Sequence, residues 1–463
     1  MNTSSSMAPT DLAQPPGRAV IVGLGKTGLS VARFLSAQGW SLTVTDSREE
    51  PQGVAELLQL APDTPMYFGA AEAQILAGAK GLAEASLVVA SPGVSPANTV
   101  LRTARDRGLA VVGDIELFAR ARRARALTAP VAGITGTNGK STVTALVGDM
   151  AAKAGLRVAV GGNIGTPALD LLSTADSEMF VLELSSFQLD GTQALPLRVA
   201  AVLNLAEDHL DRYENMAAYT ASKARIFEHA DCAIVNADDP WVASMPVTGR
   251  RVTFSLTSQA DYRLEQASSG AWLLARGERV LAVADMKLIG RHNEANALAA
   301  LAIGDALGLP RSAMQASLKT FAGLPHRMEW VAERAGVRYV NDSKGTNVGA
   351  TLAAVAGLAQ PLVLIAGGDG KGQDFSPLVA ALRDRARLVV LIGRDAPKIA
   401  EALSGSVPTR CVANIEEAVT VAAATALPGD TVLLSPACSS LDMFRDYAQR
   451  GEIFRDCVLR GLA

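Results

Sequence analysis

The sequence predicts an α/β protein built from three domains, and three observations support this fold class. The chain has 463 residues, which corresponds to about three domains of ~150 residues each. Glycine-rich turns directly follow short apolar strands at 23–28 and 136–139. After residue 323, apolar strands alternate with helical segments, which is typical of a mostly parallel sheet.

Composition excludes several classes of protein. Hydrophobic residues make up 49% of the chain and the net charge is −3, so neither nucleic acid nor an anionic membrane surface is an expected partner. No apolar run reaches about 18 residues, so we expect no membrane span. The four cysteines are far apart, which predicts reduced thiols in a cytoplasmic protein. We also expect the protein to be a monomer. Residues 1–18 are polar and proline-containing, which predicts a disordered leader rather than a signal peptide.

The first predicted domain covers residues 19–118. A strand at 19–22 leads into G23-L-G-K-T-G28, a helix follows, and a second strand at 42–45 ends at Asp46. This is the Rossmann fingerprint of a dinucleotide site. Three interpretations stay open: an NAD(P) site, a turn that needs glycines only for packing, or a loop that holds the diphosphate of another nucleotide. A further strand at 87–90 ends in S91-P-G-V94, where open α/β sheets bind ligands. The basic run R-A-R-R-A-R at 120–125 is interpreted as a solvated linker.

The second predicted domain covers residues 119–323 and opens with a phosphate-binding pattern. A strand at 131–135 is followed by the turn Gly136, Thr137, Asn138, Gly139 and a helix that begins at Lys140-Ser141-Thr142. Backbone N–H groups, the helix dipole and the lysine together favour an anion. The strict P-loop pattern is incomplete because Ile134 stands where it requires glycine, and a polar turn capping a helix is the alternative. The pattern assigns Lys140 to phosphate and Ser141 or Thr142 to Mg²⁺.

Three more side chains in this domain are candidates for chemistry. Glu183 lies in an apolar strand at 180–184, where a carboxylate is costly to bury without a partner, so either a metal-ligand role or a structural role is open. His209 lies between Asp208 and Asp211, just after a strand at 199–205, and a metal role and a structural role are equally plausible. Lys223 lies on a predicted helix at 217–227, and considered alone it is interpreted as a charged residue on the protein surface.

The third predicted domain covers residues 324–463. Strands are expected at 337–341, 362–366, 388–392 and 431–434. Three of them end in polar turns, N341-D-S-K-G-T-N347, G367-G-D-G-K-G-Q-D-F375 and S435-P-A-C-S-S-L-D-M-F444. Turn chemistry explains each turn alone, but three at the ends of strands in one domain predict one shared ligand site.

The motifs G-T-N-G-K-S, G-G-N-I-G, L-E-L-S-S-F-Q-L, N-L-x-x-D-H-L-D-R-Y, H-N-x-x-N and L-P-H-R occur here in one order, followed by the three turns of the last domain. Together they resemble the Mur ligase family over nearly all of the chain after residue 18. The resemblance implies a Rossmann-like first domain, a P-loop ATPase-like central domain and a Rossmann-like last domain. Within the family the last motifs resemble those of the members that add D-glutamate. It therefore implies an ATP-dependent ligase that joins D-glutamate to UDP-N-acetylmuramoyl-L-alanine in peptidoglycan precursor synthesis.

The resemblance also implies roles for matching positions. The ATP-binding residues would be Gly136, Thr137, Asn138, Gly139, Lys140, Ser141, Thr142, Asn296, Arg327 and Asp342. The residues for the UDP-substrate would be Lys26, Thr27, Gly28, Asp46, Ser47, Arg48, Ser91, Pro92, Gly93 and Asn163. Those for D-glutamate would be Thr346, Lys371, Ser440, Leu441 and Tyr447. Two Mg²⁺ ions would be held by Ser141, Glu183, His209 and a carbamylated Lys223, and the catalytic set would be Lys140, Glu183, His209 and Lys223.

Other functions remain possible from the sequence. The loop at 23–28 leaves open an NAD-dependent oxidoreductase, and the phosphate-binding pattern alone is compatible with a non-catalytic nucleotide-binding regulator. Another amino-acid ligase of the same family is the nearest competitor.

Overall fold

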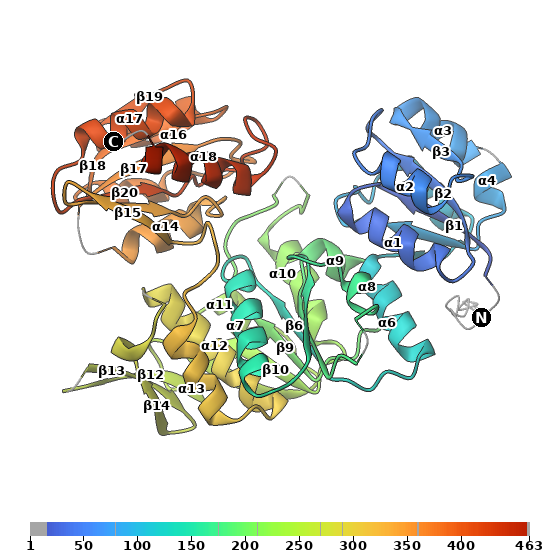
Figure 1. The fold of residues 1–463 in the computed structure, drawn as a ribbon, viewed down its shortest axis with the longest axis horizontal. Coiled ribbons are helices and arrows are strands. Elements are labelled where there is room, and N and C mark those ends of the chain that lie inside the picture. The colour runs from blue at the N-terminus through green and yellow to red at the C-terminus, as the bar shows by residue number, and fades with distance from the viewer. Residues whose placement is uncertain are drawn as a thin grey trace.

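The computed structural model contains three α/β domains that follow one another along the chain (Figure 1). It describes residues 16–78, 80–174, 176–210, 212–268, 270–288, 290–358 and 361–460. The predicted α/β class is therefore confirmed. Most of the predicted leader, residues 1–15, lies outside the described residues, as does Asp211. Arg18, which the prediction placed in the leader, is instead the first residue of a strand.

The N-terminal domain has a parallel five-stranded sheet in the order β3-β2-β1-β4-β5. Its strands are β1 (Arg18–Val22), β2 (Ser41–Asp46), β3 (Met66–Phe68), β4 (Leu87–Ala90) and β5 (Val111–Val112). Its helices are α1 (Lys26–Ser36), α2 (Val54–Leu60), α3 (Gly69–Gly78), α4 (Lys80–Ala83) and α5 (Thr99–Asp106). The central strand β1 is almost wholly apolar and buried, as expected where helices cover both faces of a parallel sheet.

Helix α6 (Asp114–Ala124) connects the first two domains, and the boundary predicted after residue 118 falls inside it. The basic run that was interpreted as a solvated linker largely belongs to this helix, and that interpretation is wrong for Arg120 and Arg122, which are buried. Arg120 is paired with Glu116 one turn away at 2.9 Å. The Arg122 guanidinium lies 5.5 Å from the centre of the Phe180 ring. Helix packing thus buries the apolar stems of side chains that look solvent-exposed in the sequence.

The central domain has a nine-stranded sheet in the order β14-β13-β12-β11-β10-β9-β6-β8-β7. Its strands are β6 (Val131–Thr135), β7 (Val158–Gly162), β8 (Met179–Glu183), β9 (Val199–Val202), β10 (Cys232–Asn236), β11 (Arg250–Ser255), β12 (Tyr262–Ala267), β13 (Gly270–Ala275) and β14 (Glu278–Ala282). Its helices are α7 (Lys140–Lys153), α8 (Ala168–Leu171), α9 (Ser186–Asp190), α10 (Met216–Ala224), α11 (Pro240–Ala243), α12 (Arg291–Leu307) and α13 (Arg311–Thr320), with 3₁₀ turns at Arg225–Phe227 and Val283–Asp285. Strands β12 to β14 pair antiparallel, unlike the rest of the sheet.

Two predicted elements of this domain end earlier than expected. The strand predicted to reach residue 205 ends at Val202, because the backbone beyond it turns to other partners: the Asn204 carbonyl accepts from Thr137 N at 2.8 Å, and Leu205 N donates to Asp239 at 2.6 Å. The helix predicted over 217–227 is α-helical only to Ala224 and then tightens into the 3₁₀ turn.

The C-terminal domain has a six-stranded sheet in the order β15-β16-β20-β17-β18-β19, with β15 antiparallel at one edge. Its strands are β15 (Glu329–Arg334), β16 (Val337–Asn341), β17 (Leu362–Gly367), β18 (Ala386–Ile392), β19 (Thr409–Cys411) and β20 (Thr431–Leu434). Its helices are α14 (Val348–Ala356), α15 (Pro377–Leu382), α16 (Ala396–Leu403), α17 (Ile415–Thr425) and α18 (Tyr447–Arg460). Separate apolar clusters cover the two faces of this sheet.

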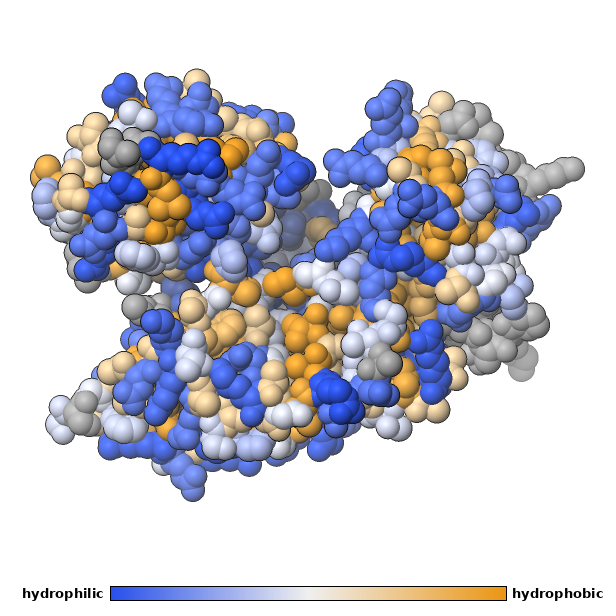
Figure 2. Space-filling view, viewed as in Figure 1, coloured by the Kyte–Doolittle hydropathy of each residue, from blue (hydrophilic) through white to orange (hydrophobic). Residues whose placement is uncertain are grey.

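The three lobes surround a hollow that Figure 2 shows above the central domain. Hydrophilic side chains cover much of the surface on this face, and apolar residues gather on the N-terminal and central domains. Among the described residues, each helix is too short or too polar to cross a lipid bilayer.

Candidate active site

The predicted phosphate loop lies between β6 and α7 at the carboxyl edge of the central sheet. Gly136 and Gly139 have φ angles of +144° and +81°, which side chains with a Cβ rarely adopt. A Cβ on Gly139 would lie 2.4 Å from the Asn296 side-chain oxygen, so any other residue there would have to displace that side chain. The side chain of Lys140 folds back on the loop, and its ammonium donates to the carbonyls of Gly136 and Thr137 at 2.9 and 2.7 Å. Burial lowers the pKa of Lys140 despite the nearby Glu183 and Asp208 carboxylates.

A buried carboxylate, Glu183, lies beside the first turn of α7. The Ser141 hydroxyl donates to Glu183 Oε2, and the Asn163 amide donates to Oε1 at 2.7 Å. The Arg327 guanidinium reaches across from the C-terminal side and donates to Ser141 Oγ at 2.6 Å. Burial opposes ionisation of Glu183, but Lys140, Ser141 and Asn163 outweigh it and hold its pKa below the ordinary value. The site therefore keeps an ionised carboxylate next to a hydroxyl oxygen, a donor pair that suits Mg²⁺.

Lys223 is almost completely buried, so its assignment to the surface from the sequence alone is wrong. Its ammonium nitrogen lies 3.4 Å from Thr135 Oγ1 and 4.7 Å from the centre of the Tyr219 ring. Burial and the nearby Lys140 lower the pKa of Lys223 well below its ordinary value, against Asp208 and Glu183. The neutral amine is consequently favoured, and a neutral amine is a nucleophile.

His209 projects toward the same region with φ of +57°. Its ring stacks edge-on against Phe187 at 4.7 Å, and its Nε2 lies 3.6 Å from Asp208. Burial lowers the pKa of His209 to about 4, which leaves the imidazole neutral and able to bind a metal ion. Asp208 in turn lies 3.5 Å from the ammonium of Lys371 in the C-terminal domain.

The structure thus brings Lys140, Glu183, His209 and Lys223 into one neighbourhood, in which Glu183 and Lys140 affect the pKa of Lys223, and both lysines affect that of His209. Among the residues that the structure describes, no group of three or more His, Cys, Asp or Glu side chains is arranged to hold a metal ion. The predicted set contains only two such residues and depends on Ser141 and on a modified Lys223 for the rest. The two metal sites stay predictions.

A cleft of about 150 Å³ lies between the central and C-terminal domains. Six of the predicted ATP residues line it: Asn138, Gly139, Thr142, Asn296, Arg327 and Asp342. Burial raises the pKa of Asp342 to about 7. Ligand pockets usually measure about 300–1,000 Å³, so this cleft is smaller than a typical ligand site.

A second, wider cleft of about 720 Å³ lies at the carboxyl edge of the N-terminal sheet. Eight of the residues predicted for the UDP-substrate line it: Lys26, Thr27, Asp46, Ser47, Arg48, Ser91, Pro92 and Gly93. Gly28 instead packs against the Gly23 carbonyl, where a Cβ would lie 2.0 Å from the oxygen. Asn163 is in the central domain. Asp46 accepts from Leu24 N and from the Arg48 side chain, and despite partial burial these contacts hold its pKa low.

The residues predicted for D-glutamate are less closely gathered. Lys371, with φ of +51°, faces Asp208, whereas Tyr447 lies under the ammonium of Lys344 at 3.8 Å. Ser440 is buried, Thr346 is partly buried, and Leu441 is 70% exposed.

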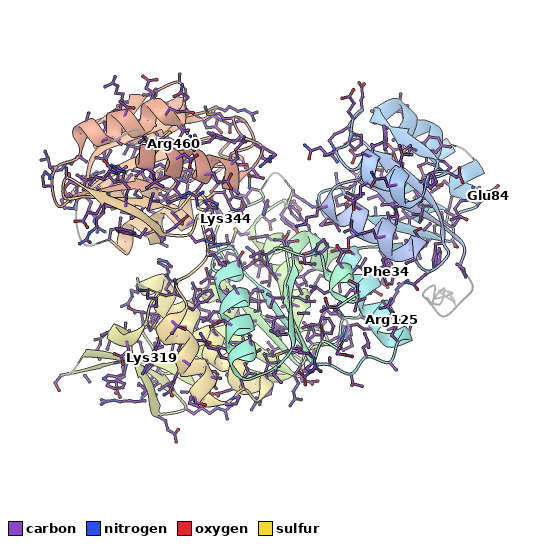
Figure 3. All side chains as sticks on the ribbon, in the orientation of Figure 1. Phe34, Glu84, Arg125, Lys319, Lys344 and Arg460 are labelled. Atoms are coloured by element: carbon purple, nitrogen blue, oxygen red, sulfur yellow. The ribbon has the colours of Figure 1, made fainter. Side chains whose placement is uncertain are left out.

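Lys344 belongs to the N-D-S-K motif, which gave it no predicted role, and Figure 3 places it at the junction of the central and C-terminal domains. Burial lowers the pKa of Lys344 to about 8. Sequence reasoning also gave no role to Asn204, whose side chain exchanges hydrogen bonds with the Asn138 backbone at 2.8 and 3.0 Å. Lys344 lies in the N-D-S-K motif and Asn204 begins the N-L-x-x-D-H motif, so these two motifs are the sequence features that could have pointed to them.

The N-terminal and central domains are joined by polar contacts near both sites. Lys26 donates to the Gly165 carbonyl at 2.5 Å, and Arg33 pairs with Asp170 at 2.6 Å. Figure 3 shows Phe34 and Arg125 at this junction, where the guanidinium lies 5.7 Å from the ring centre. These contacts fix the N-terminal domain against the central domain.

Comparison with known families accounts for most of the chain. Residues 17–113 match the model described as Mur ligase MurD-like, N-terminal domain, residues 134–304 match the Mur ligase middle domain, and residues 326–438 match the Mur ligase, glutamate ligase domain. The chain belongs to the Mur ligase family. This membership confirms the family predicted from the motifs and leaves the oxidoreductase interpretation of the loop at 23–28 without support.

Two relatives of this Mur ligase are about half identical to it. A protein of Nitrosococcus oceani is 49% identical over 96% of this chain and 97% of its own length, and one of Methylococcus capsulatus is 50% identical over 96% and 95%. Both are named UDP-N-acetylmuramoylalanine--D-glutamate ligase.

Solved structures support the fold. The UDP-N-acetylmuramate-alanine ligase of Thermotoga maritima has a TM-score of 0.61 at 21% identity and covers 96% of this chain and 100% of its own. A pseudomurein peptide ligase of Methanothermus fervidus has a TM-score of 0.58 at 17% identity, with 90% and 96% covered.

Proposed function

We propose that this Mur ligase uses ATP to join D-glutamate to UDP-N-acetylmuramoyl-L-alanine, releasing ADP and phosphate in peptidoglycan precursor synthesis. The observation that carries the proposal is the near 50% identity, over almost the whole chain, to relatives that bear the D-glutamate ligase name. The arrangement of the two clefts supports it. We further propose a cytoplasmic location, consistent with four free cysteines, and a monomer.

The chemistry follows from the difficulty of making an amide from a carboxylate, because oxide is a very poor leaving group. The alanyl carboxylate takes the γ-phosphoryl group of ATP to form an acyl phosphate, and the amine of D-glutamate then displaces phosphate. Phosphoryl transfer depends on positioning and on neutralising charge. We assign these tasks to Lys140 at the phosphate loop and to Arg327, which reaches the same loop from the C-terminal side.

Mg²⁺ would be held by Ser141, Glu183, His209 and carbamylated Lys223, and when bound it would neutralise the charge of the triphosphate. The donor chemistry fits, since Glu183 is kept ionised and His209 neutral. The lowered pKa of Lys223 favours the neutral amine that carbamylation requires.

The clefts have different tasks in this proposal. The wide cleft holds the uridine diphosphate, with Lys26 and Arg48 supplying positive charge. The narrow cleft holds ATP between Asn296, Arg327 and Asp342. Closure of the C-terminal domain brings Lys371 and the bound D-glutamate toward the acyl phosphate and excludes water that would hydrolyse it.

The proposal is tested by measuring phosphate release with a panel of UDP-muramoyl acceptors and amino acids. Release should depend on both UDP-N-acetylmuramoyl-L-alanine and D-glutamate. Lys140→Ala should abolish turnover while UDP-substrate binding in the separate N-terminal domain survives. Release with a different amino acid, or substantial activity in the variant, would overturn the proposal.

A further inference from the structure

The segment that crosses from the central to the C-terminal domain, residues 321–328, has an unusual backbone. Gly323, His326 and Met328 have φ angles of +94°, +62° and +48°. For a residue with a Cβ this region costs about 1–2 kcal/mol, so the surroundings must hold His326 and Met328 there.

His326 is held on all sides, and it is only 7% exposed. Its backbone N–H donates to Glu329 Oε2 at 2.8 Å, and its carbonyl accepts from Lys344 N at 3.0 Å. Its ring lies 2.9 Å from the Asn341 amide nitrogen and packs edge-on to Tyr447 with 6.1 Å between ring centres. Three elements of the C-terminal domain, β15, β16 and α18, therefore hold one residue of the crossing segment.

The orientation of Asn341 defines which ring nitrogen carries the proton. Its Oδ1 accepts from Ser343 N at 3.1 Å, so its NH₂ group faces the ring. His326 Nδ1 is the nearest of three acceptors around that group, at 2.9 Å, with Glu329 Oε2 at 3.2 Å and the Gly451 carbonyl at 3.1 Å. The ring is thus neutral with its proton on Nε2. Burial lowers the pKa of His326 and keeps it neutral, against the opposing effects of Glu329 and Glu452.

Gly451 in α18 makes room for this ring. A Cβ at that position would lie 2.3 Å from His326 Nδ1 and 3.0 Å from the Asn341 amide nitrogen. A methyl group there cannot coexist with the ring as placed, although alanine is otherwise favoured over glycine in a helix.

The residues on either side of His326 belong to the proposed reaction site. Arg327 donates to Ser141 Oγ at 2.6 Å, and Met328 N donates to Asp342 Oδ1 at 3.2 Å. Lys344, tied by its backbone to His326, places its ammonium 3.8 Å from the Tyr447 ring centre. A shift of His326 would therefore move a predicted ATP residue and a predicted D-glutamate residue together.

We propose that His326 is a positioning residue whose ring locks the crossing segment to the C-terminal domain, so that Arg327 and the D-glutamate residues close onto the phosphate loop as one rigid body. The inference rests on the proposed function and deepens it. The bend during closure is confined to residues before His326, where Gly323 supplies the freedom. Loss of the lock leaves the UDP-substrate cleft intact, because that cleft is in the N-terminal domain.

The test compares His326→Asn with His326→Gln and His326→Ala. Asparagine tolerates positive φ and carries an oxygen near the position of Nδ1, whereas glutamine places its oxygen one bond further and alanine has none. We expect His326→Ala and His326→Gln to raise the KM for D-glutamate about tenfold or more and to lower kcat. We expect His326→Asn to restore most of both, and the Kd for the UDP-substrate to be unchanged in all three.

Gly451→Ala should also displace the His326 ring, because the added methyl group would occupy part of its space. It should raise the KM for D-glutamate as His326→Ala does, and the double variant His326→Ala/Gly451→Ala should be no worse than His326→Ala, because the methyl group then occupies the space of the ring. Hydrogen exchange at the Lys344 amide should accelerate in His326→Ala, in Gly451→Ala and in His326→Gln, and stay slow in His326→Asn.

The outcomes separate this inference from the proposed function. If the wild-type enzyme releases no phosphate with D-glutamate, the proposed function fails, while the exchange measurement still decides whether His326 is a lock. If the enzyme is active but His326→Ala leaves both the KM for D-glutamate and the exchange at Lys344 unchanged, the inference is overturned. Equal losses in His326→Asn and His326→Ala would also overturn it.

Discussion

Replacing Gly139 by alanine should damage the phosphate loop much more than the same change at Gly155, at the other end of α7. The two glycines have nearly equal φ angles, +81° and +85°, so alanine has the same backbone cost at both, about 1–2 kcal/mol. They differ in their surroundings: a Cβ on Gly155 would have nothing within 4 Å, whereas one on Gly139 would lie 2.4 Å from Asn296 Oδ1.

The clash at Gly139 adds two further costs. Asn296 is buried and donates to Asn293 Oδ1 at 3.1 Å. Moving it aside loses that hydrogen bond, about 1 kcal/mol, and overpacks its surroundings by about 1–3 kcal/mol. We therefore expect Gly139→Ala to destabilise the central domain by about 3–6 kcal/mol and Gly155→Ala by about 1–2 kcal/mol.

Urea unfolding followed by a probe of the central domain measures the stability difference, since a three-domain chain need not unfold in one step. Equilibrium binding of ATP with Mg²⁺ measures the second effect. Gly155→Ala should leave the Kd unchanged, and Gly139→Ala should raise it at least tenfold because the methyl group displaces Asn296, a predicted ATP residue. If both variants destabilised the central domain equally, the proposed clash between a Cβ at position 139 and Asn296 would be refuted.

Three other predictions concern buried ionisable groups. Lys223→Ala should be inactive and partly restored by short-chain carboxylic acids; an unmodified Lys223 in the mass spectrum of the active enzyme, together with no rescue, would exclude the carbamate. Burial raises the pKa of Asp114 from 3.8 to about 6, so its contribution to stability is complete below about pH 4 and is lost as the pH rises through 6. Asp114→Asn should abolish that loss, up to about 3 kcal/mol, in unfolding curves measured from pH 4 to 7. Arg450 is fully buried and donates to the Ser343 carbonyl and the Cys438 carbonyl at 2.8 and 3.2 Å. Arg450→Met leaves these buried acceptors without a donor, so it should lower the free energy of unfolding of the C-terminal domain by about 1–3 kcal/mol, and an unchanged free energy of unfolding would contradict this.

Local sequence predicted the elements next to the clefts well. The strand at 131–135 and the strand at 431–434 have the bounds that their apolar runs predict, because a strand buried on both faces needs an uninterrupted apolar segment. The predictions failed where side chains depend on distant partners. The antiparallel strands β12 to β15 were not predicted as separate elements.

Lys223 shows the limit of sequence reasoning for the site. The sequence of its helix does not distinguish it from a surface lysine. Its ammonium lies near Thr135 of the distant strand β6 and beside the ring of Tyr219, one turn earlier in α10. Its place near Glu183 and His209 came only from the family resemblance, and the pKa that favours a neutral amine came only from the structure.

The sequence by itself determined the α/β class, the glycine turns and the family, since these depend on residues that are close together in the chain. The tertiary structure alone decided which charged groups lose their water and which residues from different domains meet. Arg327 reaches Ser141 and Lys371 reaches Asp208 across domain boundaries, and His326 fits beside Gly451 more than a hundred residues further along the chain. Desolvation and long-range contact depend on how the domains pack, and no local pattern of residues encodes that arrangement.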